Sequence, residues 1–473
     1  MSLSRRHVIT AAAAGAAFSG FARLADAASD THAQVEADLY HSEVAGYGPL
    51  KTDPFGLFDL PEGFSYTVVS RAGDPMSDGL VTPRKADGMG CFGLGGSRVA
   101  LVRNHELKAY DADFGPFGVG HGLAGKLDAG LAYDRYGDGR ALPGGTTTMV
   151  YDLRARRLET VHLSLTGTST NCCGGITPWG SWLSCEEIIS GAGGQKDHGW
   201  VFEVPASHRG VVEPVPLKGL GRFRHEAACI DPTTGVVYLT EDEGDGLFYR
   251  FLPNDRRRLG QGGRLQALGF KDGGGDARNW DAVAWAPVQW REAVWIDLEG
   301  VDNPHGDLRA RGQAAGAARF ARGEGVFFGR GELYFTCTSG GPARFGQIMR
   351  YRPSRFEGDA RETDEPGRLQ LFVESADRRL MNMCDNLSVA PWGHLMVCED
   401  KAEPGGVNYL KGVTPEGKVY TMGRQAQPGR SDVGANTELA GACFSPDGST
   451  LFVNVYEPGM TVAIVGPWGR FAA

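Results

Sequence analysis

One pattern recurs six times along the chain and constrains its fold more than any other feature. Each copy has an acidic or polar residue, a run of small or apolar residues, a turn, a run of β-forming residues and another acidic or polar residue. Two short β-forming runs joined by a turn rich in Pro, Gly or Asp are typical of a β-hairpin. The six copies span Asp87–Glu106, Cys172–Glu187, Glu226–Asp242, Glu324–Cys337, Asp385–Asp400 and Glu438–Asn454.

Neighbouring copies are far enough apart for two further strands each, and candidates such as Trp200–Val204 and Leu247–Phe251 lie between them. Four-stranded units repeated six times predict an all-β fold, a six-bladed β-propeller, over residues 60–473. The last copy lacks room for four strands before Ala473. We therefore expect the strand Phe64–Val69, near the N-terminus, to close the last blade and remove the exposed strand edges.

Residues 1–27 have the pattern of an export signal. Arg5 and Arg6 precede an Ala-rich apolar stretch, and a small-x-small motif ends at Ala27. The paired arginines favour the twin-arginine export machinery as a partner, although the general secretory route stays open. We expect a periplasmic or secreted protein in which residues 28–59 form an N-terminal extension. No later window offers the roughly 20 apolar residues of a membrane anchor.

Composition argues against several classes of protein. With 48 basic and 57 acidic residues the net charge is −9, so a nucleic-acid-binding surface is not expected. The nine cysteines are odd in number and include no CxxC pair, which argues against a disulfide framework and against structural zinc. Several of them lie in apolar runs, where a buried thiol is expected.

The acidic residues at the two ends of the hairpins carry the functional prediction. The first strand of a hairpin begins where the second one ends, so these residues should gather around one mouth of the central channel. So many carboxylates repel one another unless cations neutralise them. Oxygen ligands favour calcium, magnesium or manganese, whereas a thiolate and an imidazole favour a transition metal at one position. The predicted ring comprises Asp87, Cys172, Glu226, Glu324, Asp385 and Glu438, and a second set comprises Glu106, Glu186, Glu187, Glu241, Asp242, Glu399 and Asp400.

Cys172 and Arg322 differ from the other residues of this face. Cys172 lies as far before its turn as Glu226 lies before its own, so the register selects Cys172 rather than Cys173 as a ligand. A buried thiol without a metal is the alternative. Arg322 lies two residues before Glu324, where it forms either an ion pair or a clamp on a phosphate or carboxylate of the substrate.

Several short motifs follow one another between Leu60 and Trp468. They include Leu60-Pro61-Glu62-Gly63-Phe64, Asn104-His105-Glu106, Asn171-Cys172, Arg224-His225-Glu226, Thr240-Glu241-Asp242, Arg322-Gly323-Glu324-Gly325, Asp385-Asn386-Leu387 and Cys398-Glu399-Asp400. In this order they resemble the PhoX-type alkaline phosphatase family. The resemblance implies a calcium-dependent enzyme on a six-bladed propeller, with Fe3+ and Ca2+ at the channel mouth. We also expect a monomer. The implied substrates are small-molecule phosphate monoesters, attacked by a metal-bound oxo or hydroxide group to release inorganic phosphate.

The resemblance also implies roles for individual residues. Cys172, Glu226 and Glu324 would hold iron, and Arg322 would bind phosphate, which makes Arg322, Glu324 and Cys172 the candidate catalytic residues. The implied calcium ligands are Glu187, Asp242, Asp385, Glu399 and Asp400, and Glu106 and Glu241 of the second set are further candidate metal ligands.

Two other functions are compatible with the sequence. A calcium-propeller lactonase or phosphotriesterase-like hydrolase would need one catalytic calcium ion and no contribution from Cys172. A non-catalytic exported propeller that binds a ligand would use calcium for stability alone and would not need Arg322.

Overall fold

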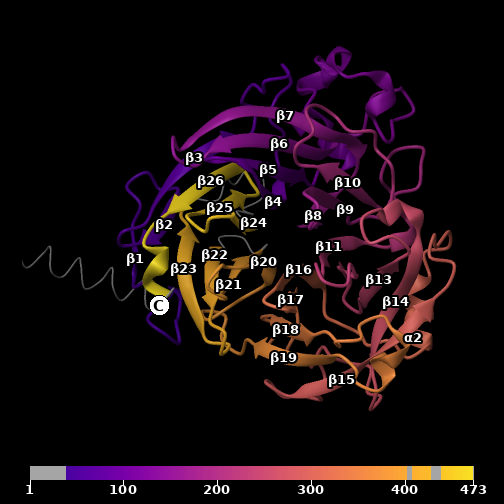
Figure 1. Ribbon diagram of the computed structural model, residues 1–473. Coiled ribbons are helices and arrows are strands. Elements are labelled where there is room, and N and C mark those ends of the chain that lie inside the picture. The colour runs from indigo at the N-terminus through magenta and orange to yellow at the C-terminus, as the bar shows by residue number, and fades with distance from the viewer. Residues whose placement is uncertain (1–38, 402–406, 428–437, 472–473) are drawn as a thin grey trace, which may run out of the picture.

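The computed structural model of the protein describes residues 39–401, 407–427 and 438–471. The predicted export signal and the first part of the predicted extension lie outside these ranges. The described residues are mostly strands, arranged in a propeller-like way around a centre (Figure 1), so the all-β prediction is confirmed. Within those ranges no helix is long and apolar enough to cross a membrane.

Six hairpins occur where the repeated pattern predicts them, and their first strands form a ring. They are β4 (Ala86–Gly95) with β5 (Arg98–His105), β8 (Asn171–Ile176) with β9 (Ser181–Glu186), β11 (His225–Ile230) with β12 (Val237–Glu241), β16 (Gly323–Gly329) with β17 (Glu332–Cys337), β20 (Cys384–Val389) with β21 (Leu395–Glu399), and β24 (Leu439–Phe444) with β25 (Thr450–Val455). Each first strand contacts the next one along the chain, and β24 contacts β4, which closes the ring (Figure 1).

Outer strands extend these hairpins, and the strands of the described residues form five hydrogen-bonded sheets. The outer strands are β6 (Gly144–Asp152), β7 (Arg157–Thr168), β10 (Val201–Pro205), β13 (Phe248–Pro253), β14 (Gly263–Phe270), β18 (Gln347–Arg352), β19 (Arg368–Glu374), β22 (Tyr409–Val413), β23 (Val419–Gln425) and β26 (Met460–Val465). The third and fourth hairpins share one nine-stranded sheet because β15 (Trp290–Leu298) pairs with both β14 and β19.

The N-terminal part of the described chain completes two of the sheets. β3 (Ser65–Arg71) pairs with β26, from Arg71 opposite Met460 to Ser65 opposite Val465, as the sequence predicts for the last hairpin. β1 (Leu50–Lys51) pairs with β2 (Phe58–Pro61), and β2 pairs with β23. Residues of the predicted extension therefore add strands to the sheet of the fifth hairpin.

Short helices lie in the connections between strands. They are α2 (Leu308–Ala314) and the 3-10 helices Ala109–Phe114, Val119–His121, Ala124–Lys126, Ala129–Leu131, Lys218–Leu220, Leu259–Gln261, Ala360–Thr363 and Trp468–Phe471.

Small residues allow the inner strands to converge at the centre. A Cβ atom on Gly325 of β16 would lie 2.7 Å from the backbone nitrogen of Leu387 on β20, closer than carbon and nitrogen atoms approach without a shift. Larger side chains fill the space between sheets farther out, where Phe248 and Phe335 stack with their ring centroids 4.3 Å apart. Burial of such apolar surface, at roughly 25 cal/mol per Å², stabilises the ring.

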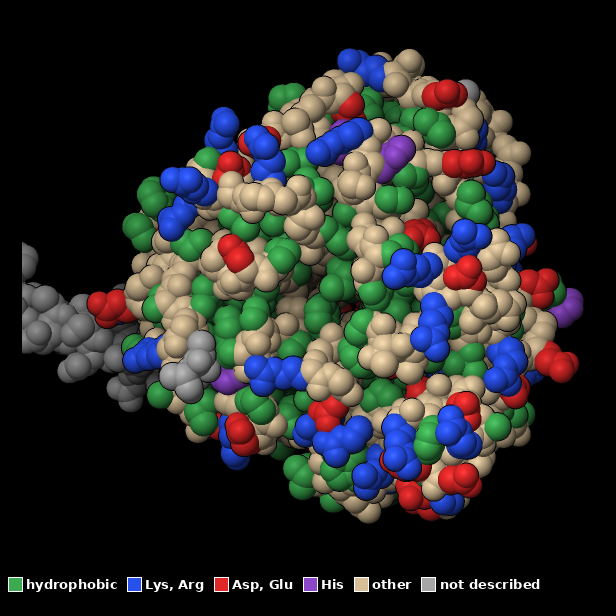
Figure 2. Space-filling view, viewed as in Figure 1, with side chains coloured by type: hydrophobic (Ala, Val, Ile, Leu, Met, Phe, Trp, Pro, Cys, Tyr) green, Lys and Arg blue, Asp and Glu red, His purple; other side chains and the backbone are tan. Residues whose placement is uncertain are grey.

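The two ends of the central channel differ in polarity. Near the turns of the hairpins, a cavity of about 380 Å³ is lined mainly by apolar side chains, among them Cys173, Val326, Phe328 and Cys443. Hydrophobic side chains surround the hollow at the centre of the face in Figure 2. The buried acidic clusters lie at the other, open ends of the hairpins.

Candidate metal centre

The same backbone hydrogen bond closes the open end of each of the six hairpins. The residue after the second strand donates its N–H to the C=O of the residue before the first strand, and from Glu187 to Thr170 this distance is 2.9 Å. The six donor and acceptor pairs are Glu106 to Lys85, Glu187 to Thr170, Asp242 to Arg224, Thr338 to Arg322, Asp400 to Met383 and Tyr456 to Glu438. Residues at the two ends of a hairpin therefore lie side by side, as the sequence predicts.

Five of the six first strands carry a possible metal ligand as their second residue. These residues are Asp87, Cys172, Glu226, Glu324 and Asp385, whereas β24 has Ala440 at this position. Glu438 lies two residues earlier, at the position that Arg322 occupies in the fourth hairpin. The strand register thus brings acidic and thiol side chains from five different segments of sequence to the centre of the ring.

These side chains form two overlapping clusters. One ligand atom of each of Cys172, Glu187 and Glu226 lies within 4.8 Å of the others, and the same holds for Glu226, Glu324 and Asp385. All five residues are buried or nearly so. Glu226 belongs to both clusters, so its carboxylate could contribute a ligand atom to either one.

The Glu226 carboxylate is fully buried, and neither of its oxygens receives a hydrogen bond from the described residues. Burial raises its pKa well above the ordinary value, and the charge of Glu324 raises it further. Burial is also the largest cause of the raised pKa of five neighbouring carboxyl groups, those of Asp87, Glu187, Glu324, Asp385 and Glu438. A buried group of acids with so few donors is the environment in which bound cations replace protons.

Cys172 lies on the side of the centre nearest Asp87. Its Sγ is 3.5 Å from Oδ2 of Asp87, and its backbone oxygen accepts a hydrogen bond from Nδ2 of Asn104 at 3.0 Å. Cys173, next in sequence, lines the apolar cavity instead. Burial raises the pKa of the Cys172 thiol, so a nearby cation is needed to favour the thiolate.

Arg322 lies across the second cluster and contacts two carboxylates. Its Nε and Nη2 are each 2.9 Å from an oxygen of Asp242, and its Nη2 is also 2.7 Å from Oε1 of Glu324. The charge of Glu324 is the main cause of the raised pKa of this guanidinium. About a third of the side chain is exposed, so it can contact both the buried acids and a bound molecule.

Glu241 contacts the backbone and an arginine rather than the two clusters. Its Oε2 accepts hydrogen bonds from the N–H of Leu247 at 3.0 Å and from the hydroxyl of Tyr249 at 2.9 Å, and Arg309 lies 3.5 Å from Oε1. Burial raises the pKa of Glu241 to about 7. In this position the carboxylate fixes the start of β13.

Glu399 makes corresponding contacts in the fifth hairpin. Its oxygens accept hydrogen bonds from the N–H groups of Asn382 at 2.9 Å and Tyr409 at 3.1 Å, and from Nζ of Lys401 at 2.6 Å. In both hairpins, the last carboxylate of the second strand thus secures the third strand. The residues that follow them, Asp242 and Asp400, are among those whose charges raise the pKa of Glu324.

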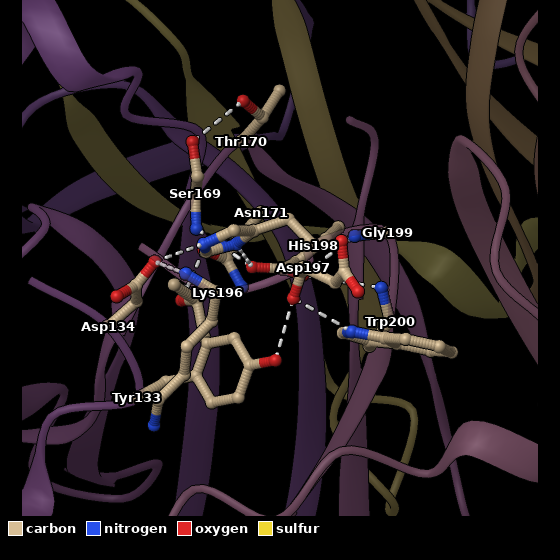
Figure 3. A network of polar contacts seen from close by, with 12 residues as sticks. Tyr133, Asp134, Ser169, Thr170, Asn171, Lys196, Asp197, His198, Gly199 and Trp200 are labelled. Atoms are coloured by element: carbon tan, nitrogen blue, oxygen red, sulfur yellow. Dashed lines mark hydrogen bonds and ion pairs between the residues drawn. The ribbon is translucent and has the colours of Figure 1, made fainter. Parts of the chain in front are cut away.

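Glu186 has the same place in the second hairpin and joins the polar network that includes Asp134, His198, Gly199 and Trp200 (Figure 3). Its Oε2 accepts hydrogen bonds from the N–H groups of Gly199 and Trp200, and Nδ1 of His198 lies 2.7 Å from its Oε1. The other ring nitrogen of His198 lies 3.0 Å from Oδ2 of Asp134. Burial opposes the charged imidazolium, but the two carboxylates outweigh it and raise the pKa of His198.

Glu106 lies at the edge of the centre. The hydroxyl of Tyr456 donates a hydrogen bond to its Oε2, and Nζ of Lys108 is 3.3 Å from its Oε1. The charge of Glu106 raises the pKa of Asp87, which places this carboxylate close to the clusters.

Sequence reasoning missed three residues of this face, namely Arg224, Lys108 and Tyr456. Arg224 contacts Glu187 and had a visible signal, because Arg224-His225-Glu226 has the same spacing as Arg322-Gly323-Glu324. Tyr456 follows a second strand, where four other hairpins have a carboxylate. Lys108 had no signal, because it lies in a loop outside the repeated pattern.

The fold and the clusters define a propeller-like all-β protein with a buried acidic centre, and comparison with known proteins gives its family. The model of the family described as alkaline phosphatase PhoX matches residues 45–459. The chain therefore belongs to the PhoX alkaline phosphatase family and is a phosphatase. Among curated proteins, none matches the chain.

One solved structure supports the fold. PhoX of Pseudomonas fluorescens, solved in complex with vanadate, a transition-state analogue, is similar with a TM-score of 0.64 at 20% identity. The match covers 90% of this chain and 98% of that one. A gluconolactonase of Xanthomonas campestris has a TM-score of 0.41 at 11% identity, over 90% of this chain and all of that one. At that TM-score the second similarity supports no conclusion.

Proposed function

We propose that the chain hydrolyses phosphate monoesters at a multi-metal centre built on the two clusters, and releases inorganic phosphate. The observation that carries this proposal is the Glu226 carboxylate, which is buried, lacks hydrogen-bond donors among the described residues and lies within reach of both clusters. An ionised carboxylate without a partner is costly in a buried site, and cations held by this carboxylate and its neighbours would offset that cost.

The donor atoms suit iron and calcium. We assign Fe3+ to Cys172, Glu226 and Glu324, because one thiolate among carboxylates favours a transition metal. Carboxylate oxygens suit Ca2+, which accepts many oxygen ligands in a flexible geometry. The proposed calcium ligands are Glu187, Asp242, Asp385 and Asp400, with Glu106 at the edge, while Glu241 and Glu399 support neighbouring strands.

The protein's own residues bind and orient the substrate. Bound cations supply charge that neutralises the phosphoryl oxygens and Lewis acidity that activates water. Arg322 is held by Asp242 and Glu324, so its guanidinium is already oriented to donate hydrogen bonds to phosphoryl oxygens. No side-chain nucleophile is required in this scheme.

The fold and location of the protein complete the proposal. We regard the nine-stranded sheet as two blades joined by β15, which gives six blades, one for each first strand of the ring. The paired arginines in residues 1–27 support export by the twin-arginine route to the periplasm or the medium. We expect the exported protein to act as a monomer.

Elemental analysis and a phosphatase assay of the same preparation test the proposal. We expect iron and calcium in the purified protein, together with calcium-dependent release of phosphate from an aryl phosphate. Cys172→Ala should lose iron and activity together. Calcium without iron, in a protein whose activity does not depend on Cys172, would replace the iron assignment with a calcium-only hydrolase. Full metal content without hydrolysis of the ester would instead indicate a non-catalytic binding protein.

A further inference from the structure

Arg224 and Arg322 occupy equivalent positions in neighbouring hairpins. Each lies directly before a first strand and two residues before a glutamate of the clusters. The backbone oxygen of each accepts the closing hydrogen bond of its hairpin, from Asp242 at 3.3 Å for Arg224 and from Thr338 at 3.0 Å for Arg322. The fold therefore presents two guanidinium groups at the same level of the centre, one hairpin apart.

The two arginines also have equivalent partners. Nη2 of Arg322 binds Asp242, the residue after the second strand of the third hairpin, and Nη2 of Arg224 binds Glu187, the residue after the second strand of the second hairpin. Each arginine thus reaches back to the carboxylate at the end of the preceding hairpin. Glu187 belongs to the first cluster, so Arg224 flanks that cluster as Arg322 flanks the second.

Arg224 keeps hydrogen-bond donors available for another anion. Its Nη1 makes an ion pair with Glu243 at 3.7 Å, beyond hydrogen-bond distance, and so keeps its capacity to donate. Its Nε has no acceptor in the described parts of the chain and is buried, so it would donate only to a ligand seated within the centre. About a third of the side chain is exposed, as for Arg322. When Glu187 ligates a cation it shares its charge with that cation, and its hold on the guanidinium weakens.

The backbone around Arg224 fixes the direction of its side chain. His225 is fully buried, and its Nε2 lies 2.9 Å from the backbone oxygen of Gly221. The ring of Phe223, also buried, stacks on His225 with centroids 3.6 Å apart. The two neighbours of Arg224 are thus anchored in the core, and Arg224 projects toward the acids of the centre.

From this geometry we infer that Arg224 is a second phosphate-binding residue, which holds the substrate phosphoryl group together with Arg322. A phosphate monoester presents three terminal oxygens, more than one guanidinium can bind with its planar pair of donors. Arginines on either side of Glu226 would bind different oxygens and fix the orientation of the group. This inference rests on the proposed function, because it assigns a second residue to the same substrate site.

Titration with inorganic phosphate tests the inference separately from catalysis. We would compare metal-loaded wild type with Arg224→Gln and Arg224→Lys, with Arg322→Gln as a second site variant. Arg98→Gln is the control, since Arg98 lies at the turn end of the first hairpin, where its side chain is largely exposed and pairs with Glu159. Calorimetry gives the phosphate affinity, elemental analysis gives the metal content, and kinetics give KM and kcat.

We expect Arg224→Gln to bind phosphate about 10- to 100-fold more weakly at unchanged metal content, which is the effect of losing a charged hydrogen bond. KM should rise by at least the factor by which kcat falls, Arg224→Lys should recover part of the affinity, and Arg98→Gln should match wild type. Unchanged phosphate affinity in Arg224→Gln would overturn the inference. Loss of metal in both Arg224 variants would overturn it too, because Arg224 would then act by holding Glu187. Wild type that binds phosphate but releases none from esters would contradict the proposed function instead, while the affinities could still be compared.

Discussion

Asp242 and Arg322 form a two-pronged ion pair across neighbouring hairpins, with two nitrogens of the arginine each 2.9 Å from a different carboxylate oxygen. The pair fixes the plane of the guanidinium. Its third contact, from Nη2 to Glu324, ties the same group to the second cluster. An arginine oriented in this way loses little conformational freedom when it binds a phosphoryl group.

Arg322→Lys should therefore be a poor replacement, although it keeps the positive charge. A lysine ammonium cannot bind both oxygens of Asp242 in the plane of a guanidinium. We expect kcat/KM for a phosphate monoester to fall by about 10- to 100-fold, with metal content unchanged. Steady-state kinetics and elemental analysis measure both quantities, and a lysine variant with wild-type kcat/KM would show that the planar pairing is unimportant.

Cys172 and Cys173 offer a matched pair of variants one residue apart. Cys172 belongs to the first cluster, and Cys173 lines the apolar cavity. We expect Cys172→Ala to lose iron and most activity. Cys173→Ala should keep both and lose only about 1–2 kcal/mol of stability, as for a small buried apolar group. Equal iron content in the two variants would remove Cys172 from the metal centre.

Glu226→Gln should weaken metal binding without lowering the stability of the metal-free protein. The amide has a similar shape but no charge, so the variant without metal should be at least as stable as chelated wild type. It should gain little from added iron and calcium, whereas bound metal should raise the melting temperature of wild type by several degrees. Thermal unfolding with and without the metals measures this difference.

Glu241→Ala is the matched control for that variant. It removes a buried carboxylate that binds Leu247 and Tyr249. We expect a loss of about 1–3 kcal/mol of stability with metal content retained. Loss of metal from Glu241→Ala would place this residue among the ligands after all.

Chelated protein should become less stable as the pH rises. Burial raises the pKa values of Glu226 and Glu324 above their ordinary value of 4.5, so the folded state holds protons that the unfolded chain releases. The stability associated with such groups is present below the unfolded pKa and is lost as the pH rises through the folded pKa. In EDTA we expect the melting temperature to fall as the pH rises above 4.5, the ordinary pKa of these groups. With iron and calcium bound the fall should be much smaller, and a flat profile in EDTA would contradict the raised pKa values.

His198 should contribute a separate pH dependence. Its pKa is raised from 6.5 by Glu186 and Asp134, so the stability from the imidazolium is present below about pH 6.5 and is lost as the pH rises through the folded pKa. His198→Gln should therefore destabilise the protein by about 2–3 kcal/mol in mild acid and by less at alkaline pH.

His394→Gln is the control for this prediction. His394 is a buried histidine whose pKa burial lowers, and one of its ring nitrogens lies 3.0 Å from the Tyr420 hydroxyl. The loss of stability caused by His394→Gln should not decrease as the pH rises. Parallel pH profiles for the two variants would show that His198 is not charged in the folded state.

The hairpins and the face that holds the acids could be predicted from the sequence, because turn residues and acidic ends recur in a fixed order. The sequence could not predict which of two adjacent acidic residues faces the clusters. Glu241 and Asp242 are both acidic, and only the backbone shows that Glu241 binds the start of β13 while Asp242 binds Arg322. The pairing of β15 with both β14 and β19, which joins two hairpins in one sheet, could not be predicted either. Most side chains of β15 are exposed or half-buried, so its sequence lacks the alternation of apolar and polar residues that marks a strand.

The pairing of β3 with β26 has a consequence for protein synthesis. Arg71 and Met460 lie 389 positions apart, yet Nη1 of Arg71 is 3.4 Å from Sδ of Met460. Every proposed ligand, from Glu106 to Asp400, is translated before β26 emerges from the ribosome. A nascent chain that already contains all of these residues still lacks the partner strand of β3, so the last sheet can be completed only after β26 has been translated.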